Sequence, residues 1–193
     1  MRRVFIGSEA LAGGGLTRAA LRWNYRRLFP DVYVPCAISP SLRDRTLGAW
    51  LWSGRRGVIA GRAAAALHGA RWVDQQTPIE MIFRCGRPPP GIIVRNERLD
   101  GDEVTQVDGL LVTTVQRTAF DLARHRPRNE AVADLDALAQ ATGVKAVDVL
   151  ALAERYPGAR GTRRATTALG LMDAGAQSPR ETRLRLLLVD EWL

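Results

Sequence analysis

Arginines at a regular spacing are the residues in this sequence best suited to chemistry. Arg18, Arg22 and Arg26 recur at i, i+4 and i+8, so in a helix they form a stripe along one face, and Arg27 follows at once. Guanidinium groups placed in this way contact phosphates, while an arginine or Asn24 beside them reaches base edges in a major groove. The alternative is an ordinary solvated helix face, and the stripe alone leaves both interpretations open.

The distribution of charge favours contact with a polyanion. The chain carries 28 Lys and Arg against 20 Asp and Glu, a net charge of +8. Residues 1–72 hold 12 arginines against three acidic residues, a net charge of +9, whereas residues 73–193 have a net charge of −1. This asymmetry indicates an N-terminal DNA-binding module, to which Arg2 and Arg3 would add backbone contacts, on a nearly neutral body.

Two helices must position the arginine stripe. Ser8–Ala12 is expected to form a short helix with Ser8 as its N-cap, and Gly13–Gly15 to form the turn after it. Leu16–Arg26 is expected to form the basic helix, with Thr17 as its N-cap and beside the groove. Leu16, Ala20 and Trp23 recur at i, i+4 and i+7, which predicts the apolar face of that helix.

A β-hairpin is expected directly after the basic helix. Arg27–Phe29 and Val32–Val34 are typical of short strands, and Pro30-Asp31 between them has turn chemistry. A short helix, a glycine turn, a basic helix and a hairpin follow the order of a winged helix-turn-helix.

The rest of the chain predicts an α+β body followed by helices. The fold class is therefore α+β, with an N-terminal winged helix-turn-helix, an α+β middle region and a helical C-terminal part, divided at residues 1–38, 39–176 and 177–193. Strand-rich segments are expected at Pro78–Arg84, Gly91–Glu97 and Val104–Val112. Helices are expected at Leu42–Trp52, Gly61–His68, Thr114–Arg124, Arg128–Ala141, Lys145–Arg155, Gly161–Ala174 and Ser178–Leu193.

No metal or other cofactor is expected. Asp134 and Asp136 lie two apart in a predicted helix, so they point about 200° apart and do not share a metal ion. His68 and His125 are far apart in the sequence, and no Cys-x-x-Cys occurs. Each histidine is expected near a helix end, where a protonated imidazole would complement the helix dipole.

Secreted and membrane classes are also excluded. Cys36 and Cys85 are too few for a disulfide scaffold, and the apolar run after Arg2-Arg3 is too short for a signal peptide. No apolar stretch is long enough to cross a bilayer, so a cytoplasmic protein without membrane contact is expected.

The C-terminal segment predicts a well-formed helix start. Ser178 is expected as the N-cap, Pro179 as the first helical residue, and Glu181 as the partner of Ser178 in a capping box. Leu184, Leu187, Leu188 and Trp192 form an apolar stripe that requires cover.

Several segments resemble one family of actinobacterial, especially mycobacterial, proteins. Phe29–Pro35 resembles the wing of an AbiEi-type antitoxin from type IV toxin–antitoxin systems. Val4–Leu11, Leu16–Arg18, Leu42–Trp52, Gly57–Gly61 and Ala65–Ala70 continue the resemblance, as do Val112–Thr114 and Arg117–Leu122. The resemblance implies a DNA-binding autoregulator that occupies an operator, with a cognate toxin as a protein partner and a homodimer on a palindrome.

Ser178-Pro179 with Glu181-Thr182 and Leu184-Arg185 resembles the start of a very short patch repair endonuclease-like domain of the PD-D/E-x-K superfamily. By that resemblance, Glu181 and Arg185 would belong to its first helix. The metal-binding residues of such a domain would follow Leu193, so catalysis by this chain is not expected. Two alternatives to the antitoxin-like regulator therefore stay open, an inactive remnant of a DNA endonuclease and a protein-interaction module.

Overall fold

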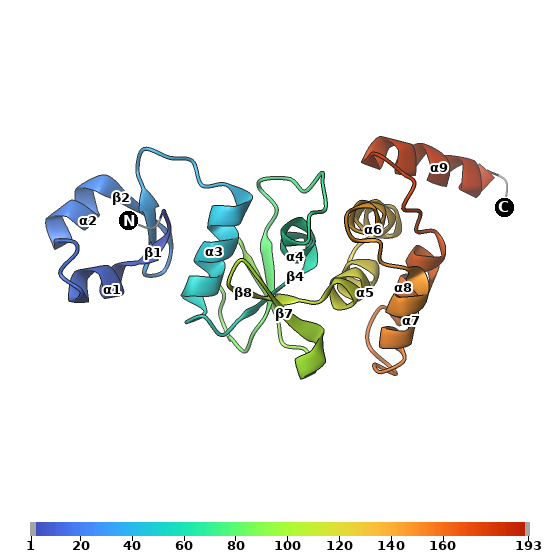
Figure 1. The fold of residues 1–193 in the computed structure, drawn as a ribbon, viewed down its shortest axis with the longest axis horizontal. Coiled ribbons are helices and arrows are strands. Elements are labelled where there is room, and N and C mark those ends of the chain that lie inside the picture. The colour runs from blue at the N-terminus through green and yellow to red at the C-terminus, as the bar shows by residue number, and fades with distance from the viewer. Residues whose placement is uncertain (1–2, 192–193) are drawn as a thin grey trace.

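The computed structural model describes residues 3–191, and the expected α+β fold is confirmed. The molecule is elongated, with the N-terminal helices at one end and the C-terminal helix at the other (Figure 1). Among the described residues, no helix is long and apolar enough to cross a membrane.

A three-stranded antiparallel sheet holds the N-terminal part together. Its strands β1 (Phe5–Ile6), β2 (Tyr25–Phe29) and β3 (Val32–Pro35) lie in the order β1-β3-β2. Helices α1 (Gly7–Ala12) and α2 (Arg18–Asn24) connect β1 to β2. The expected order of helix, turn, helix and hairpin is therefore confirmed.

Two local expectations in this part are wrong. Ser8 is not the N-cap of α1, because Ile6 occupies that position and the α1 N-terminus is capped by a residue distant in the sequence, as described below. Arg26 does not continue the helix. The backbone becomes extended at Tyr25, since β2 already pairs with β3 from Tyr25 onward, and Arg26 therefore lies in the sheet.

The body contains a five-stranded sheet in the order β6-β5-β4-β8-β7. The β4–β5 and β7–β8 pairs are antiparallel, while β4–β8 and β5–β6 are parallel. The expected Val104–Val112 segment is a hairpin that turns at Asp108-Gly109, and both turn residues have positive φ. The strands are β4 (Val58–Ala60), β5 (Ile79–Ile82), β6 (Ile92–Arg95), β7 (Val104–Val107) and β8 (Leu110–Thr113).

The remaining helices lie close to their expected positions. Helix α3 begins and ends as expected, because Ser41 and Asp44 form a capping box at its start. The bounds are α3 (Leu42–Trp52), α4 (Gly61–Leu67), η1 (Gly101–Glu103), α5 (Val115–His125), α6 (Arg128–Thr142), α7 (Ala146–Ala153), α8 (Thr162–Gly170) and α9 (Pro179–Glu191).

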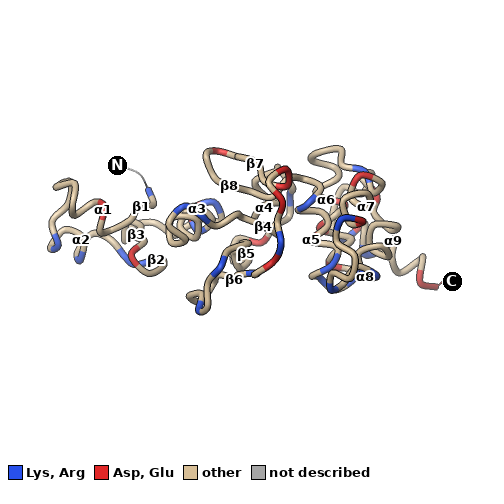
Figure 2. The backbone as a smooth tube through the Cα atoms, turned by 90° about the horizontal axis from the view of Figure 1, so that it is seen from below, with Lys and Arg blue, Asp and Glu red and all other residues tan. Residues whose placement is uncertain are grey.

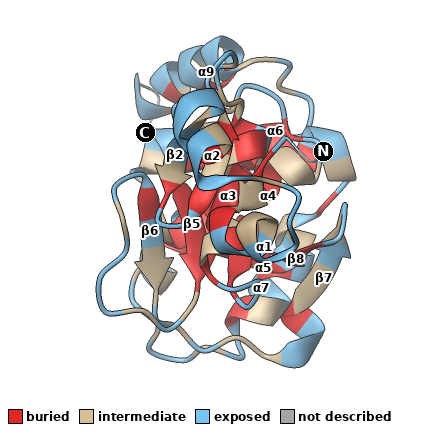
Figure 3. Cartoon of the chain, turned by 90° about the vertical axis from the view of Figure 1, so that its left-hand side faces the viewer, coloured by how far each residue is buried: buried red, intermediate tan, exposed pale blue. Residues whose placement is uncertain are grey.

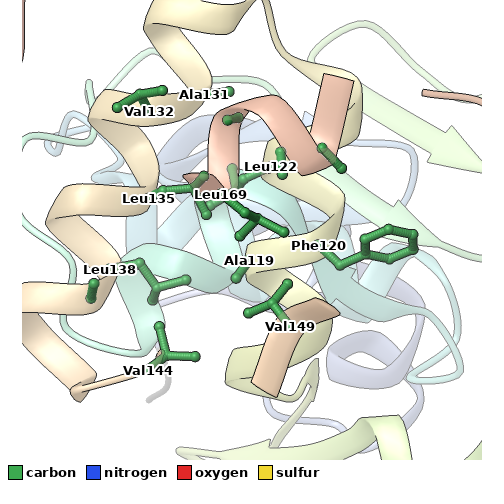
Figure 4. Close-up of a cluster of buried hydrophobic side chains, with 14 of the residues drawn as sticks. Ala119, Phe120, Leu122, Ala131, Val132, Leu135, Leu138, Val144, Val149 and Leu169 are labelled. Carbon is green, nitrogen blue, oxygen red and sulfur yellow. The ribbon is translucent and has the colours of Figure 1, made fainter. Parts of the chain in front are cut away.

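Helix α5 is the centre of the helical part. It packs against α4, α6, α7 and α8, and its Phe120 and Leu122 are buried with Leu135, Leu138 and Leu169 from α6 and α8 (Figure 4). Helix α9 joins this cluster through Leu186 alone among its leucines. The C-terminal helix is therefore attached along one narrow side.

Helix α3 connects the two sheets. Its buried residues Leu42, Ala49 and Leu51 belong to a cluster that includes Val34 of the first sheet and Val112 of the second. In Figure 3, which looks from the N-terminal end, buried residues lie on α3, α4 and β5. The N-terminal sheet and the body consequently share one hydrophobic core.

Candidate nucleic-acid interface

Helix α2 presents a compact exposed face. The Thr17 side chain accepts a hydrogen bond of 3.1 Å from the Ala20 backbone N–H, which confirms Thr17 as the N-cap. Leu21 is the buried residue of the helix, and Trp23 is 78% exposed, so the expectation that Trp23 faces the core is wrong. The packing of α2 against β2 buries Leu21 and leaves the indole of Trp23 in solvent.

The arginines of this face are available for a ligand. Arg18 and Arg22 on α2 and Arg27 on β2 are exposed, and their side chains have no hydrogen bond or ion pair to any residue from 3 to 191. Figure 2 shows basic residues at the α2 end of the molecule. The side chain of Asn24 is exposed at the end of the same helix.

Two other predicted DNA contacts have internal partners. Arg26 donates a hydrogen bond of 2.8 Å to the Ile38 carbonyl, and Arg3 lies 3.3 Å from the Asp44 carboxylate and donates weakly to the Ser39 carbonyl. Both arginines therefore fasten the segment between β3 and α3. Arg2, the remaining predicted contact, lies outside the described residues.

Two acidic residues of the N-terminal part have internal partners. Glu9 receives two hydrogen bonds of 2.7 Å from Arg55, and these bonds lower the pKa of the Glu9 carboxyl. Asp31 accepts hydrogen bonds from the backbone N–H and the hydroxyl of Ser8, so it caps the N-terminus of α1. The hairpin turn is thereby attached to α1.

Close packing supports this attachment. The turn residue Asp31 adopts a positive φ, and its carbonyl accepts a hydrogen bond of 2.8 Å from the Gly7 N–H. A Cβ atom at Gly7 would lie 2.5 Å from the Tyr33 ring, so only glycine fits where α1 meets the hairpin. The helices and the hairpin thus form one unit that holds α2 in place.

A second polar cluster lies in the body, around Arg117. This α5 residue is 1% exposed, and its guanidinium group binds the carboxylates of Glu97, Glu103 and Asp121. The Tyr156 hydroxyl donates a hydrogen bond of 2.6 Å to Glu103 and accepts one from Arg117. The cluster therefore connects α5 to the β6–β7 segment and to the end of α7.

Burial shifts the titration of this cluster. It raises the pKa of Asp121 to about 7, against the opposing effect of Arg117, and it raises the pKa of Tyr156 to about 12. Burial, helped by Arg124 and Arg95, lowers the pKa of His125 to about 3. The expectation of a protonated imidazole at the α5 end is therefore wrong, because desolvation and neighbouring arginines keep it neutral.

The cluster is built for structure rather than for a metal ion. Ligand atoms of Glu97, Asp121 and His125 lie within 4.8 Å of one another. However, Arg117 and Arg124 already bind both carboxylates, and a divalent cation would have to displace these guanidinium groups. Sequence reasoning assigned Arg117 no chemical role, although its i, i+4 spacing from Asp121 was a usable signal.

The nuclease-like motif residues also have structural partners. The Glu181 N–H donates to the Ser178 hydroxyl, which confirms Ser178 as the N-cap, while the Glu181 carboxylate accepts from the Ser178 hydroxyl and from the Gln177 N–H, one residue before the N–H that a capping box uses. Arg185 donates a hydrogen bond of 2.8 Å to the buried Asp136 carboxylate and one of 2.7 Å to the Leu171 carbonyl.

The aspartates of α6 serve different contacts, as their two-residue spacing predicts. Asp136 binds Thr182 and Arg185 on α9, whereas Asp134 lies within ion-pair distance of Arg62 and Arg126. Their carboxylates therefore face different elements. Cys36 and Cys85 are free, as expected.

Comparison with known proteins identifies a family for this chain. Residues 57–174, more than half of the chain, match the family described as AbiEi antitoxin C-terminal domain. The chain is also 28% identical over 167 residues to the uncharacterized proteins MT2308 and Rv2248 of Mycobacterium tuberculosis strains CDC 1551 and H37Rv. The alignment covers 86% of this chain and 60% of each relative, so the chain spans less than two thirds of their length.

Proposed function

Because the chain belongs to the AbiEi antitoxin family, we propose that it is a DNA-binding autoregulator of a type IV-like toxin–antitoxin system. The observation that carries the proposal is the exposed face of α2, on which the side chains of Arg18 and Arg22 have no partner among residues 3–191. In this proposal α2 enters the major groove, with Thr17 and Asn24 beside it and Arg27 on the phosphate backbone.

Charge around α2 supports double-stranded DNA as the ligand. Glu9 is paired with Arg55, so its negative charge is offset near the arginines. The side chains of Arg3 and Arg26 bind groups of the segment from β3 to α3. We therefore assign the main phosphate contacts to Arg18, Arg22 and Arg27.

The wider biological setting is part of the same proposal. The regulator would act in the cytoplasm, bind a palindromic operator as a homodimer, and engage a cognate toxin through its body. The family assignment to residues 57–174 supports a role of the body in antitoxin function. Catalysis is not part of the proposal.

A gel-shift assay with salt titration tests DNA binding. The probe is a duplex from the region upstream of the gene, and retardation is expected at about 50 mM salt. The triple variant Arg18→Ala/Arg22→Ala/Arg27→Ala should lower the slope of log affinity against log salt by about 0.9 for each lost phosphate contact.

A charge-matched control separates these contacts from general basicity. Arg163→Ala/Arg164→Ala/Arg180→Ala removes three exposed arginines from α8 and α9 and should leave the slope unchanged. The proposal fails if the wild-type protein gives no retardation at low salt, or if both triple variants change the slope equally.

The alternative interpretations have weaker support. An inactive remnant of a very short patch repair endonuclease would rest on Glu181 and Arg185, yet Glu181 caps α9 and Arg185 binds Asp136. A protein-interaction module would rest on the basic N-terminus. However, the arginines of α2 lie along one helix face, an arrangement typical of DNA-binding helices. We therefore propose neither.

A further inference from the structure

The most exposed large apolar side chain described in this protein lies on the proposed DNA-binding helix. Trp23 is 78% exposed, more than Trp72 at 59% or Leu184 at 60%. Solvation of an indole ring is unfavourable, so a tryptophan left outside the core gains free energy when a ligand covers it. The fold offers this residue no cover, because the core-facing position of α2 is occupied by Leu21.

The α2 surface is divided into two parallel strips. Arg18 and Arg22 are four residues apart and form a basic strip, while Ala19 and Trp23, each one residue further along, form an apolar strip beside it. The apolar strip lies on the side of the helix opposite Leu21, and the basic strip lies between that side and Leu21. Ala19 has a small side chain, which permits close approach of the helix backbone to a ligand at this point.

Resting on the DNA binding proposed above, we infer that Trp23 and Ala19 determine sequence specificity by contacting thymine methyl groups in the major groove. The C5-methyl of thymine is the apolar group on the major-groove edge of the base pairs, and apolar side chains recognise it by contact. The basic strip holds the helix on phosphates or guanine edges, and the apolar strip then lies over the adjacent bases. Preferred sites therefore contain thymine next to the positions that Arg18 and Arg22 contact.

The surroundings of Trp23 favour DNA over a protein partner. The neighbouring side chains on the exposed face are guanidinium groups without partners, and the acidic residues Glu9 and Asp31 are bound elsewhere in the fold. An acidic ligand that also displays methyl groups beside its anions matches both strips at once, and double-stranded DNA has this chemistry.

Selection from a random-sequence duplex library provides the test. Wild-type protein should select sites that share a thymine position, and Trp23→Phe should retain the preference because the phenyl ring keeps an apolar contact. Trp23→Ala should lose the preference while keeping non-specific binding and its salt slope. Trp72→Ala, which removes the exposed tryptophan between α4 and β5, is the matched control and should behave as wild type.

Methyl deletion tests the contact directly. The best duplex selected by wild-type protein is synthesised again with uracil in place of the shared thymine, which removes only the methyl group. Wild-type affinity should fall about fourfold for each methyl contact, a change that corresponds to burial of one methyl-sized group. Trp23→Ala should bind both duplexes equally.

The outcomes distinguish this inference from the function on which it rests. A wild-type protein that binds no duplex at low salt contradicts DNA binding itself. A protein that binds DNA but selects no thymine, or that tolerates uracil without loss, overturns the role of Trp23 and leaves DNA binding intact. Because Trp23 is exposed and alanine favours helices, the variant is expected to fold, which circular dichroism verifies.

Discussion

Arg185 of α9 donates a hydrogen bond of 2.8 Å to the Asp136 carboxylate of α6, and Thr182 donates another of 2.7 Å to the same oxygen. The second oxygen of Asp136 accepts the backbone N–H of Asp173. One buried carboxylate thus fastens α9 and the segment before it to the helical core. This contact matters because Leu186 is the leucine of α9 that reaches the hydrophobic cluster.

Replacement of Asp136 should detach α9. Asp136→Ala leaves the Arg185 guanidinium and the Thr182 hydroxyl without their acceptor, so the free energy of unfolding should fall by about 3 kcal/mol. Urea denaturation measures the loss, and hydrogen exchange should show it first in α9. Asp148→Asn, at an exposed site in α7, should change stability by only a few tenths of a kcal/mol. Equal effects of both variants would contradict the role of Asp136.

Removal of the Arg117 side chain should be more damaging. Arg117→Met leaves Glu97, Glu103 and Asp121 without their shared guanidinium group, and the expected loss is about 3 to 5 kcal/mol. Arg117→Lys should restore little of the lost stability. A single ammonium group does not bind three carboxylates at once, as the planar guanidinium group does. Thermal unfolding measures both, with exposed Arg163→Met as the control, and a stable Arg117→Met protein would refute the assignment.

His125 should contribute an acid-sensitive part of the stability. Its pKa is lowered to about 3 in the folded state, so the unfolded state binds a proton near pH 6.5 that the folded state does not. The contribution of His125 is therefore complete above pH 6.5 and decreases as the pH falls toward 3. Between pH 7 and 5 this contribution should fall by about 2 kcal/mol.

The comparison with His125→Asn isolates this contribution. Asp121 titrates in the opposite sense, since its raised pKa favours the folded state as the pH falls below about 7, but it is present in both proteins. Between pH 7 and 5, denaturant unfolding should show a change in the free energy of unfolding that is about 2 kcal/mol more favourable in His125→Asn than in the wild type. Identical pH dependence would show that the pKa of His125 is the same in the folded and unfolded states.

A side chain at Gly48 of helix α3 should destabilise the protein. A Cβ atom there would lie 2.7 Å from Leu28 and 3.2 Å from Phe29 of the hairpin. Gly48→Ala should therefore cost about 1 kcal/mol even though alanine favours a helix. Gly170→Ala, at the end of α8 where the space is open, should instead stabilise the protein by about 0.5 kcal/mol. Stabilisation by both variants would contradict the close approach of α3 to the hairpin.

The success of sequence-based prediction followed local signals. Helix α3 was predicted residue for residue, and the structure shows that Ser41 and Asp44 form a capping box at its start, a contact local to the sequence. Strand β4 was missed because Val58–Ala60 is buried on both faces and passes into α4 without a turn, so it shows neither alternation nor a boundary.

The exposed and buried sides of α2 required tertiary information. Leu21 and Trp23 are both apolar and lie about 200° apart on the helix, so periodicity alone did not decide which one faces the core. The cluster around Arg117 also depends on distant segments, since Glu97, Glu103 and Tyr156 come from outside α5. The arginines of α2 were identified from spacing alone, while the internal contacts of Arg3 and Arg26 became evident only in three dimensions.

The hydrophobic core shared through α3 has a mechanical consequence. With Val34 and Val112 in one cluster, the N-terminal sheet does not swing as a separate body from the rest of the chain. If two copies pair through their bodies, the protein then fixes the distance between their two α2 helices. Insertion of half a helical turn between two operator half-sites would place one of them on the wrong side of the duplex.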